Sequence, residues 1–401
     1  MRILIITALY PDDSPIEVTN AIHDLVRFWT DSHEVICFKE DWIYAPHILR
    51  RGKLIEQIKL LKGYQYCERD KVRIYRFTGI ANLFARFNIH FFGFFEKVMV
   101  NKMNKVLGCI EKPDVVIAHM PVLNVVDYIK YLKIDCPKIA VLHRSDTDWL
   151  DSARWGKGVV RRKINLINDQ FDAVFSRSHS IYRQLLELGK IDCLKEVIIS
   201  SGVPQCEEYH EKDWNAWNVR KKNILYVGKL IKQKGVDVIL ESLNNISKEY
   251  AFELTIIGEG EELENLQSLI KELHLEEHVA IAGKRSREEV YEYMSKADVF
   301  VMPARHETLG LVYLEAMANG CITIGSKEEG IDGIILNGEN GFLVKALDVK
   351  ELTECLESIM KMDSLDLRQI SQNAKATADK YTPKDRSDIY LKKVIEVRMK
   401  E

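Results

Sequence analysis

The chain has 401 residues, which is too long for one compact core and indicates two domains. Its formal net charge of -3 argues against a general nucleic-acid binder, which usually carries a basic excess. The eight cysteines are scattered without a C-x-x-C pair, so they indicate reduced thiols in a cytoplasm rather than a disulfide framework or a zinc site.

The first half alternates short apolar runs with interrupted polar stretches. The N-terminal run lacks the three regions of a signal peptide, and no later run reaches the roughly 18 apolar residues of a membrane span. Strands are expected at 2–10, 33–38, 114–120, 138–143, 172–178 and 196–203. This pattern predicts a doubly wound α/β domain over residues 1–205.

The second half has a more regular rhythm. Strands are expected at 224–228, 253–258, 278–283, 298–303, 321–325 and 341–344, and helices at 236–247, 261–275, 286–297 and 310–320. Ser286 and Glu289 have the spacing of a capping box. The alternation predicts a second doubly wound domain, residues 219–382, with a parallel sheet covered on both faces. The polar segment 204–218 is interpreted as the linker, and 383–401 as a final helix.

Two glutamates stand in the apolar stretch HETLGLVYLEAMANG, residues 306–320. Glu307 follows a strand and precedes a helix, so it lies at the carboxyl edge of the sheet, where ligands bind. The free amides of Gly310 and Leu311 would form an anion site at the helix N-terminus. A ligand with a phosphate there and hydroxyls to either side would use both Glu307 and Glu315. Alternatively, Glu307 is a solvated loop residue and Glu315 pairs with a structural Arg or Lys.

The segment YVGKLIKQKG, residues 226–235, places lysines at the same sheet edge. Gly228 ends a strand, and Lys229, Lys232 and Lys234 follow it. Compact ammonium charges at this place suit a diphosphate, although a solvated basic loop would have the same composition.

The turn 258–260, GEG, follows the next strand. Gly258 could let the backbone approach a ligand, or it could serve only a tight strand-to-helix turn, which is the favoured interpretation. The turn is not a G-x-G-x-x-G fingerprint, so a nicotinamide enzyme is poorly supported.

In the first half a strand delivers His143 to the sheet edge within IAVLHRSDTDW. Histidine transfers protons or donates hydrogen bonds near neutral pH, but a lone histidine is more often structural. Asp146 and Asp148 form a D-x-D string that holds a divalent metal in another class of transferases, which this architecture does not favour. His119, at another strand end, is expected to be structural.

Residues 80–102 are rich in Phe with interleaved basic side chains, and 154–163 is a second basic stretch with a Trp. Both could contact a membrane surface. They could equally be domain helices with apolar faces in the core.

Taken together, the motifs between about 224 and 345 resemble the retaining glycosyltransferases of family 4, which have the GT-B fold. The motifs are YVGKLIKQKG, IIGEGEELENLQSLI, VAIAGKRSREEVYEYMSKADVFVMP, HETLGLVYLEAMANG and EEGIDGIILNGENGFLV. The resemblance implies two Rossmann-like domains facing each other across a cleft, with the C-terminal helix crossing back to the first.

The resemblance also implies roles. Glu315 would accept hydrogen bonds from the nucleotide ribose, and Glu307 would contact hydroxyls of the donor sugar. The amides of Gly310 and Leu311 would meet the distal phosphate, with Thr308 and Leu309 beside them. Lys229 and Lys234 would neutralise the leaving diphosphate, and His143 would lie near the donor sugar. The lysines would do a metal's electrostatic work, so no metal or other cofactor is expected.

Two features depart from the family. Many members carry Arg where Lys229 stands, and many have a Gly-Gly loop where this chain has 12–15, Asp-Asp-Ser-Pro. The second departure puts the first domain's contribution to the diphosphate in doubt.

The expected reaction is transfer of a sugar from a UDP- or GDP-linked donor to a saccharide or lipid-linked acceptor, with retention at the anomeric carbon. The family setting implies cell-surface polysaccharide or glycolipid assembly in the cytoplasm, at the inner face of the membrane. Two alternatives stay open: a nucleotide-sugar epimerase of the same fold, and a non-catalytic subunit that binds the sugar nucleotide.

Overall fold

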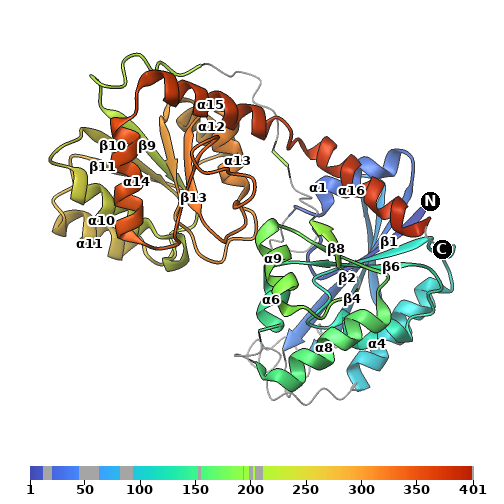
Figure 1. Cartoon of the computed structure of the whole chain (residues 1–401). Helices are drawn as coiled ribbons and strands as arrows, with labels where there is room; N and C mark the ends of the chain where they lie inside the picture. Colours follow the sequence, from blue (N-terminus) through green and yellow to red (C-terminus); the bar gives the residue numbers. More distant parts are fainter. Residues whose placement is uncertain are drawn as a thin grey trace. The chain divides into compact units, whose positions relative to one another are not determined.

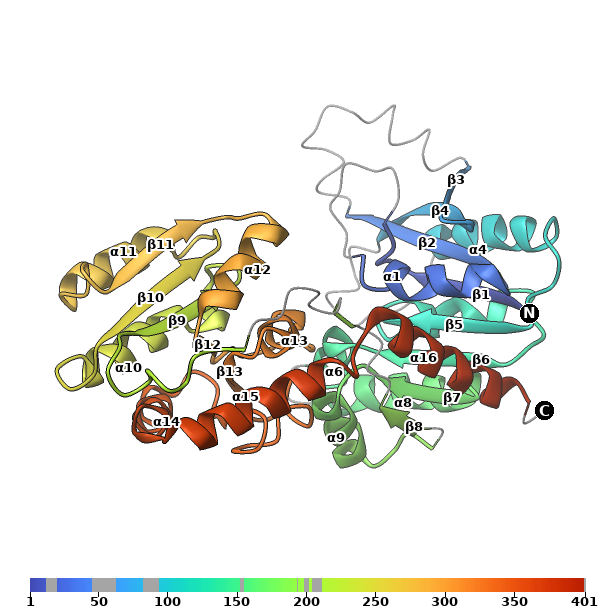
Figure 2. The same ribbon diagram turned by 90° about the horizontal axis from the view of Figure 1, so that it is seen from above.

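A computed structural model describes residues 1–11, 20–44, 63–81, 94–151, 155–192, 194–197, 202–203 and 211–399. The chain divides into two compact units (Figures 1 and 2). The first unit comprises residues 1–177, 181–201 and 386–401, and the second comprises 178–180 and 202–385. The C-terminal segment therefore returns to the first unit after the second is complete.

The first unit is built on a mainly parallel sheet. Its strands are β1 (Arg2–Thr7), β2 (Glu34–Tyr44), β3 (Tyr64–Arg69), β4 (Val72–Ala81), β5 (Val115–His119), β6 (Lys138–Leu142), β7 (Ala173–Ser176) and β8 (Leu194–Val197). Their order is β3-β4-β2-β1-β5-β6-β7-β8, and only β3 runs antiparallel to its neighbour. The strand order reverses between β1 and β5, which is the switch point of a doubly wound sheet.

Helices cover both faces of this sheet. They are α1 (His23–Val26), η1 (Arg27–Asp31), α4 (Phe94–Leu107), α5 (Val125–Tyr128), η3 (Ile129–Tyr131), α6 (Arg144–Trp149), α8 (Lys157–Gln170), α9 (His179–Leu188) and α16 (Pro383–Arg398). One buried cluster joins the sheet to α4 and α8 through residues such as Met103 and Ile164. The opposite cluster includes Trp29 of η1 and Tyr390 and Val394 of α16. The C-terminal helix is therefore part of the first unit's core.

The second unit is a parallel sheet of β9 (Lys222–Val227), β10 (Phe252–Ile257), β11 (Val279–Gly283), β12 (Val299–Val301), β13 (Ile322–Ser326) and β14 (Phe342–Val344). The order is β11-β10-β9-β12-β13-β14, with every pairing parallel. Its helices are α10 (Val236–Ile246), α11 (Leu263–Glu272), α12 (Arg287–Lys296), α13 (Leu311–Ala318), α14 (Val349–Lys361) and α15 (Ser364–Ala378), with a short η4 (Lys232–Lys234). Helix α10 contacts α11 and α14, while α13 contacts α12 and α15, so the helices form two layers. The predicted α/β class with two Rossmann-like folds is confirmed.

The predicted capping box is confirmed at the start of α12. The amide of Glu289 donates to Ser286 Oγ at 3.2 Å, and the amide of Ser286 donates to Glu289 Oε2 at 2.8 Å. These two bonds satisfy backbone donors that the first helical turn leaves free, which fixes where the helix begins.

The second part of the predicted linker does not behave as a solvated segment. Residues 204–210 lie outside the described residues, but Trp214 and Trp217 are fully buried in the second unit. Lys212 Nζ donates to the carbonyls of Met294 and Ser295, both at 3.0 Å. Residues 211–218 are therefore anchored by two indoles that the polar composition of the stretch concealed.

Within the part of the chain that the structure describes, no helix is long and apolar enough to cross a membrane. Residues 82–93, in the middle of the Phe-rich stretch, and 152–154, at the start of the second basic stretch, lie outside the described residues. Of the described remainder of the Phe-rich stretch, residues 80 and 81 end β4, and 94–102 lie in α4, where Met99 and Val100 are core residues.

Candidate functional site

The order of the second sheet reverses at β9, which has β10 on one side and β12 on the other. Ligands of doubly wound sheets bind at the carboxyl ends of the strands at this reversal. Lys229 and Lys234 follow β9, and Glu307 follows β12. The topology thus places both predicted loops at the switch point.

The loop after β9 and the loop after β12 are joined by an ion pair and by a backbone hydrogen bond. Lys234 Nζ pairs with Glu307 Oε2, and both side chains are largely shielded from solvent. The amide of Arg305 donates to the carbonyl of Gln233 at 2.7 Å. Glu307 Oε1 accepts from the amide of Thr308 at 3.0 Å, which leaves its carboxylate tied to the loop on one side and to the lysine on the other.

A second carboxylate, that of Glu329, accepts a hydrogen bond from the backbone of the loop that carries Glu307. Glu329, which is buried, accepts from the amide of Glu307 through Oε2 at 2.8 Å. The amide of Gly330 donates to the carbonyl of Glu307 at 3.0 Å. Glu329 was not among the predicted site residues, although the EEG sequence that contains it belongs to the motifs of the resemblance.

Helix α13 begins with an open N-terminus. Gly310 is the N-cap, with φ of 73°, no side-chain cap is present, and the first turn carries no acidic residue. A Cβ at Gly310 would lie 2.5 Å from the ring of Tyr313, so glycine is required there. The amides of Leu311 and its neighbours thus keep the partial positive charge of the helix terminus for an anion. Leu309, just before the cap, is buried and anchors the loop.

Glu315 lies on α13 with its carboxylate turned toward α12. Oε1 accepts from Arg287 Nη2 at 2.9 Å and lies 3.4 Å from the hydroxyl of Tyr291. Glu315 is mostly buried, whereas the Arg287 side chain is 55% exposed. The structure therefore contains the arginine partner that the alternative interpretation of Glu315 requires. Arg287 and Tyr291 carry no sequence signal that would have selected them.

Gly258 packs against Gly228, another glycine of the predicted site. It has φ of 150°, and a Cβ at this position would lie 1.8 Å from the carbonyl oxygen of Gly228. The amide of Gly228 donates to the carbonyl of Ile257 at 3.0 Å. This close approach gives a backbone reason for the glycine, in line with the favoured interpretation of a tight turn.

The remaining predicted lysine, Lys229, is exposed. Its carbonyl accepts from the hydroxyl of the buried Tyr226 at 2.9 Å, which fixes the backbone of the loop. The loop geometry therefore presents Lys229 to solvent and Lys234 to Glu307.

In the first unit His143 follows β6 and caps the N-terminus of α6. Its Nε2 lies 3.1 Å from Nδ1 of His119, whose Nε2 lies 3.1 Å from the hydroxyl of Tyr390 on α16. Burial, followed by the positive charge of Arg177, holds the pKa of both histidines well below the usual value. His119 is a buried and hydrogen-bonded residue, in line with its expected structural role.

The D-x-D string does not form a free pair of carboxylates. Asp146 is buried, and its oxygens accept from the amides of His143 at 2.8 Å and Val122 at 3.0 Å. Burial raises the pKa of Asp146 to about 7. The Asp146 side chain thus hydrogen-bonds to the backbone at the start of α6 and to that of the loop after β5.

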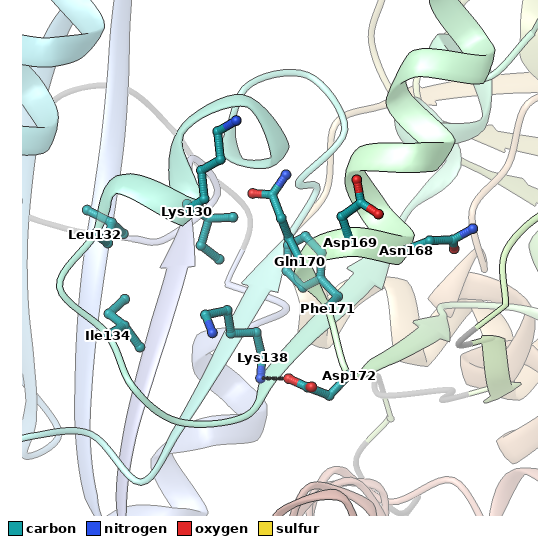
Figure 3. A pocket seen from close by; sticks show the side chains of 10 residues that line it. Lys130, Leu132, Ile134, Lys138, Asn168, Asp169, Gln170, Phe171 and Asp172 are labelled. Atoms are coloured by element: carbon teal, nitrogen blue, oxygen red, sulfur yellow. Dashed lines mark hydrogen bonds between the residues drawn. The ribbon is translucent and has the colours of Figure 1, made fainter.

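A hollow of about 340 Å³ in the first unit lies at the opposite edge of its sheet (Figure 3). Its lining includes Lys138, the first residue of β6, and Asp172, just before β7, and the Lys138 amide donates to Asp172 Oδ2 at 2.7 Å. Because this is the amino edge of the strands, the hollow contains none of the predicted site residues.

Most of the second unit is similar to a known protein family. Residues 209–377 match the model of the family "Glycosyl transferases group 1". An uncharacterized glycosyltransferase, MJ1178 of Methanocaldococcus jannaschii, is 27% identical over 62% of this chain and 66% of its own length. The N-acetyl-alpha-D-glucosaminyl L-malate synthase of Bacillus anthracis is 26% identical over 57% of this chain and 59% of its own.

Among solved structures, that of Anabaena HepE in complex with UDP has a TM-score of 0.68 at 17% identity and covers 99% of this chain and 100% of its own. This likeness establishes the fold alone. The curated relatives named above are matched over about six tenths of their length. The matched region, residues 209–377, is similar to the group 1 glycosyltransferases, and the fold of the chain is GT-B.

Proposed function

We propose that this chain is a retaining glycosyltransferase that moves a sugar from a nucleoside diphosphate sugar to a saccharide or lipid-linked acceptor. The observation that carries the proposal is the Lys234–Glu307 pair at the switch point, next to the uncapped N-terminus of α13. A cation and an anion beside free helix amides match a ligand that has a diphosphate next to hydroxyl groups.

In this proposal the distal phosphate meets the amides of Gly310 and Leu311. Lys234 and Lys229 neutralise the diphosphate as it leaves, Glu307 accepts from hydroxyls of the sugar, and Glu315 accepts from the ribose. The bond from the anomeric carbon to the phosphate oxygen breaks while a bond from the acceptor oxygen forms on the same face. The acceptor proton passes to the departing phosphate oxygen. Stabilising the negative charge that grows on this oxygen lowers the barrier.

His143 supplies a neutral imidazole in this scheme, because burial and Arg177 disfavour its charged form. A neutral ring can donate or accept one hydrogen bond at a sugar hydroxyl without repelling the positive charge that develops on the sugar. The lysines and helix amides take the electrostatic role of a metal ion, so the reaction is proposed to need no metal.

Two nucleotide classes receive support from the relatives. A mannosyltransferase of Mycolicibacterium smegmatis that is 30% identical over 34% of this chain is named as GDP-mannose-dependent. The HepE structure contains UDP. A relative in Rhizobium meliloti, 28% identical over 42% of this chain, is named for lipopolysaccharide core biosynthesis. These names support a UDP- or GDP-linked donor and a setting in cell-surface polysaccharide or glycolipid assembly.

We further propose a peripheral contact with the inner face of the plasma membrane through residues 80–102 and 154–163. The described part of the second stretch offers Trp155, which stacks on Trp149 with ring centroids 4.1 Å apart, and the exposed Lys157 and Arg161. Sedimentation with vesicles of anionic and of neutral lipid tests this contact. Binding that needs anionic lipid and fades with salt is expected.

The test of the main proposal is thermal unfolding of the purified protein against UDP-, GDP-, ADP- and CMP-sugars. A ligand at a hundred times its dissociation constant stabilises the native state by about 2.7 kcal/mol. The nucleotide that raises the midpoint is then incubated with glycoside acceptors, and the anomer of the product is determined by NMR. Retention supports the proposal. A changed sugar nucleotide without acceptor indicates an epimerase, and binding without turnover indicates a non-catalytic subunit.

A further inference from the structure

We propose that Tyr390 and His119 are positioning residues for His143, so that the C-terminal helix sets the ring orientation and tautomer of the histidine in the first unit. The inference rests on the role proposed for His143. Helix α16 then contributes to the site, although it is far from His119 and His143 along the chain.

The three side chains form one hydrogen-bonded chain, of which His143 is the partly exposed end. The hydroxyl of Tyr390 lies 3.1 Å from His119 Nε2, and His119 Nδ1 lies 3.1 Å from His143 Nε2. Tyr390 is fully buried, and His119 is 1% exposed. Along the chain, Tyr390 is 271 residues from His119, and His143 is 24 residues from His119, yet all three belong to the first unit.

The ring of His143 depends on this chain because the backbone fixes only its Cα position. The amide of His143 donates to Asp146 Oδ2 at 2.8 Å, which anchors the main chain at the start of α6. Its ring meets that of His119 edge-on, with centroids 5.4 Å apart and an interplanar angle of 71°. Rotation of either ring would break the bond between them.

The chemistry of imidazole makes the chain directional. A neutral imidazole has one N–H donor and one acceptor nitrogen, so the bond at one ring nitrogen decides what the other can do. Both histidines are held neutral, since burial and the charge of Arg177 lower their pKa. Burial raises the pKa of Tyr390, so its hydroxyl keeps its proton. The hydroxyl can donate to or accept from His119 Nε2 and so complete either proton order along the two rings, whereas a phenyl ring can complete neither.

The helix that carries Tyr390 is held independently of the histidines. Ser387 Oγ donates to the carbonyl of Leu25 at 2.7 Å, and Trp29 Nε1 donates to the carbonyl of Ser387 at 3.2 Å. Trp29 also contacts the Tyr390 ring edge-on at 5.2 Å. A matched pair of variants follows, because Tyr390→Phe and Ser387→Ala each remove one buried hydrogen bond of α16, and only the first touches His119.

The experiment records long-range proton–nitrogen NMR spectra of the full-length protein with ¹⁵N-labelled histidine. Resonances of His119 and His143 are assigned with His119→Asn and His143→Asn. Tyr390→Phe is expected to move the ring nitrogen shifts of both histidines, and Ser387→Ala to leave them in place. Equal changes in both variants would reduce Tyr390 to a docking residue, and an unmoved His143 would overturn the proposal.

A kinetic arm uses the sugar nucleotide identified by the thermal panel. Tyr390→Phe is expected to lower kcat about tenfold with little change in the donor KM, since about 1.4 kcal/mol of positioning corresponds to a factor of ten. Should Tyr390→Phe fail to fold, His119→Asn, whose amide can occupy the Nδ1 position, should retain more activity than His119→Leu. Because the spectra need no substrate, absent sugar transfer by the wild type would count against the proposed function and leave the positioning claim to the spectra.

Discussion

The ammonium of Lys234 pairs with the carboxylate of Glu307, 73 residues along the chain, where neighbouring strands β9 and β12 end. Without a ligand each group is the other's counterion in a place shielded from water. A diphosphate sugar would offer each a separate partner, phosphate for the ammonium and hydroxyls for the carboxylate. The ion pair therefore compensates both charges at a place where little water reaches them.

This relationship predicts opposite effects for its two members. Lys234→Ala should weaken binding of the nucleoside diphosphate by about tenfold or more, since a hydrogen bond to a charged group contributes about 1.5–3 kcal/mol. Glu307→Gln should leave binding of the nucleoside diphosphate unchanged or tighter, because it releases Lys234, while weakening that of the sugar nucleotide. Isothermal titration calorimetry with both ligands measures these effects. Lys232→Ala, in the same loop, is the control, and an equal loss in Lys232→Ala and Lys234→Ala would contradict the assignment.

The Glu315–Arg287 pair distinguishes a ligand contact from a structural ion pair. If Glu315 holds the ribose, Glu315→Ala should reduce nucleotide affinity about tenfold to a hundredfold, whereas Arg287→Ala should change it only a few-fold. The Arg287 side chain is 55% exposed, and exposed ion pairs contribute only about 0–1 kcal/mol. Thermal midpoints without ligand should fall little in either variant. Equal losses of affinity in both would favour a purely structural pair.

Much of the second unit could be predicted because its signals are local. The capping box at Ser286 marks the start of α12, and Gly320, with φ of 69°, lies just beyond α13, at the end of the range in which a helix is predicted. The helix expected at 236–247 is Val236–Ile246. Alternating apolar strands and amphipathic helices of this kind specify a parallel sheet with few competing topologies.

What could not be predicted is either exposed or distant in sequence. Strand β3 has five of six residues exposed, Tyr64 and Tyr66 among them, so the hairpin it forms with β4 shows no apolar alternation. The partner of Glu315 is determined by the packing of α12 against α13, and the partners of His119 by the packing of the sheet's strand ends and α16, rather than by spacing along the chain. The contact between Tyr390 and His119 is visible only in the three-dimensional structure, because no local propensity links residues 271 positions apart.

The close approach of Gly258 to Gly228 makes a stability prediction with a built-in control. Gly258→Ala should lower the free energy of unfolding by about 3 kcal/mol or more, because its Cβ would lie 1.8 Å from a backbone carbonyl oxygen. Gly283→Ala, at φ of 71° with open space around the Cβ, should cost only about 1 kcal/mol for the left-handed backbone. Urea unfolding of both variants measures the difference. Equal losses in the free energy of unfolding would show that the backbone around Gly258 shifts to accommodate the Cβ with little loss of stability.

A buried carboxyl in the first unit predicts how stability depends on pH. Glu40 on β2 is 3% exposed, its Oε2 accepts from Trp42 Nε1 at 3.2 Å, and its Oε1 has no hydrogen-bond partner among the described residues. Burial raises the pKa of Glu40 from 4.5 to about 8. Between these values the folded protein keeps a proton that the unfolded chain has lost, so this group makes the free energy of unfolding fall as pH rises.

Glu40→Gln removes that dependence while keeping an acceptor for Trp42. The variant should match the wild type near pH 5, where the wild-type carboxyl is neutral in the folded state and partly neutral in the unfolded one. Its advantage should grow to about 2–4 kcal/mol by pH 8, at up to about 1.4 kcal/mol for each pH unit. Urea unfolding of both proteins at pH 5, 6.5 and 8 gives the comparison. A difference that stays constant over this range would mean that Glu40 ionises alike in the folded and unfolded states, and that water reaches the carboxyl between β2 and α4.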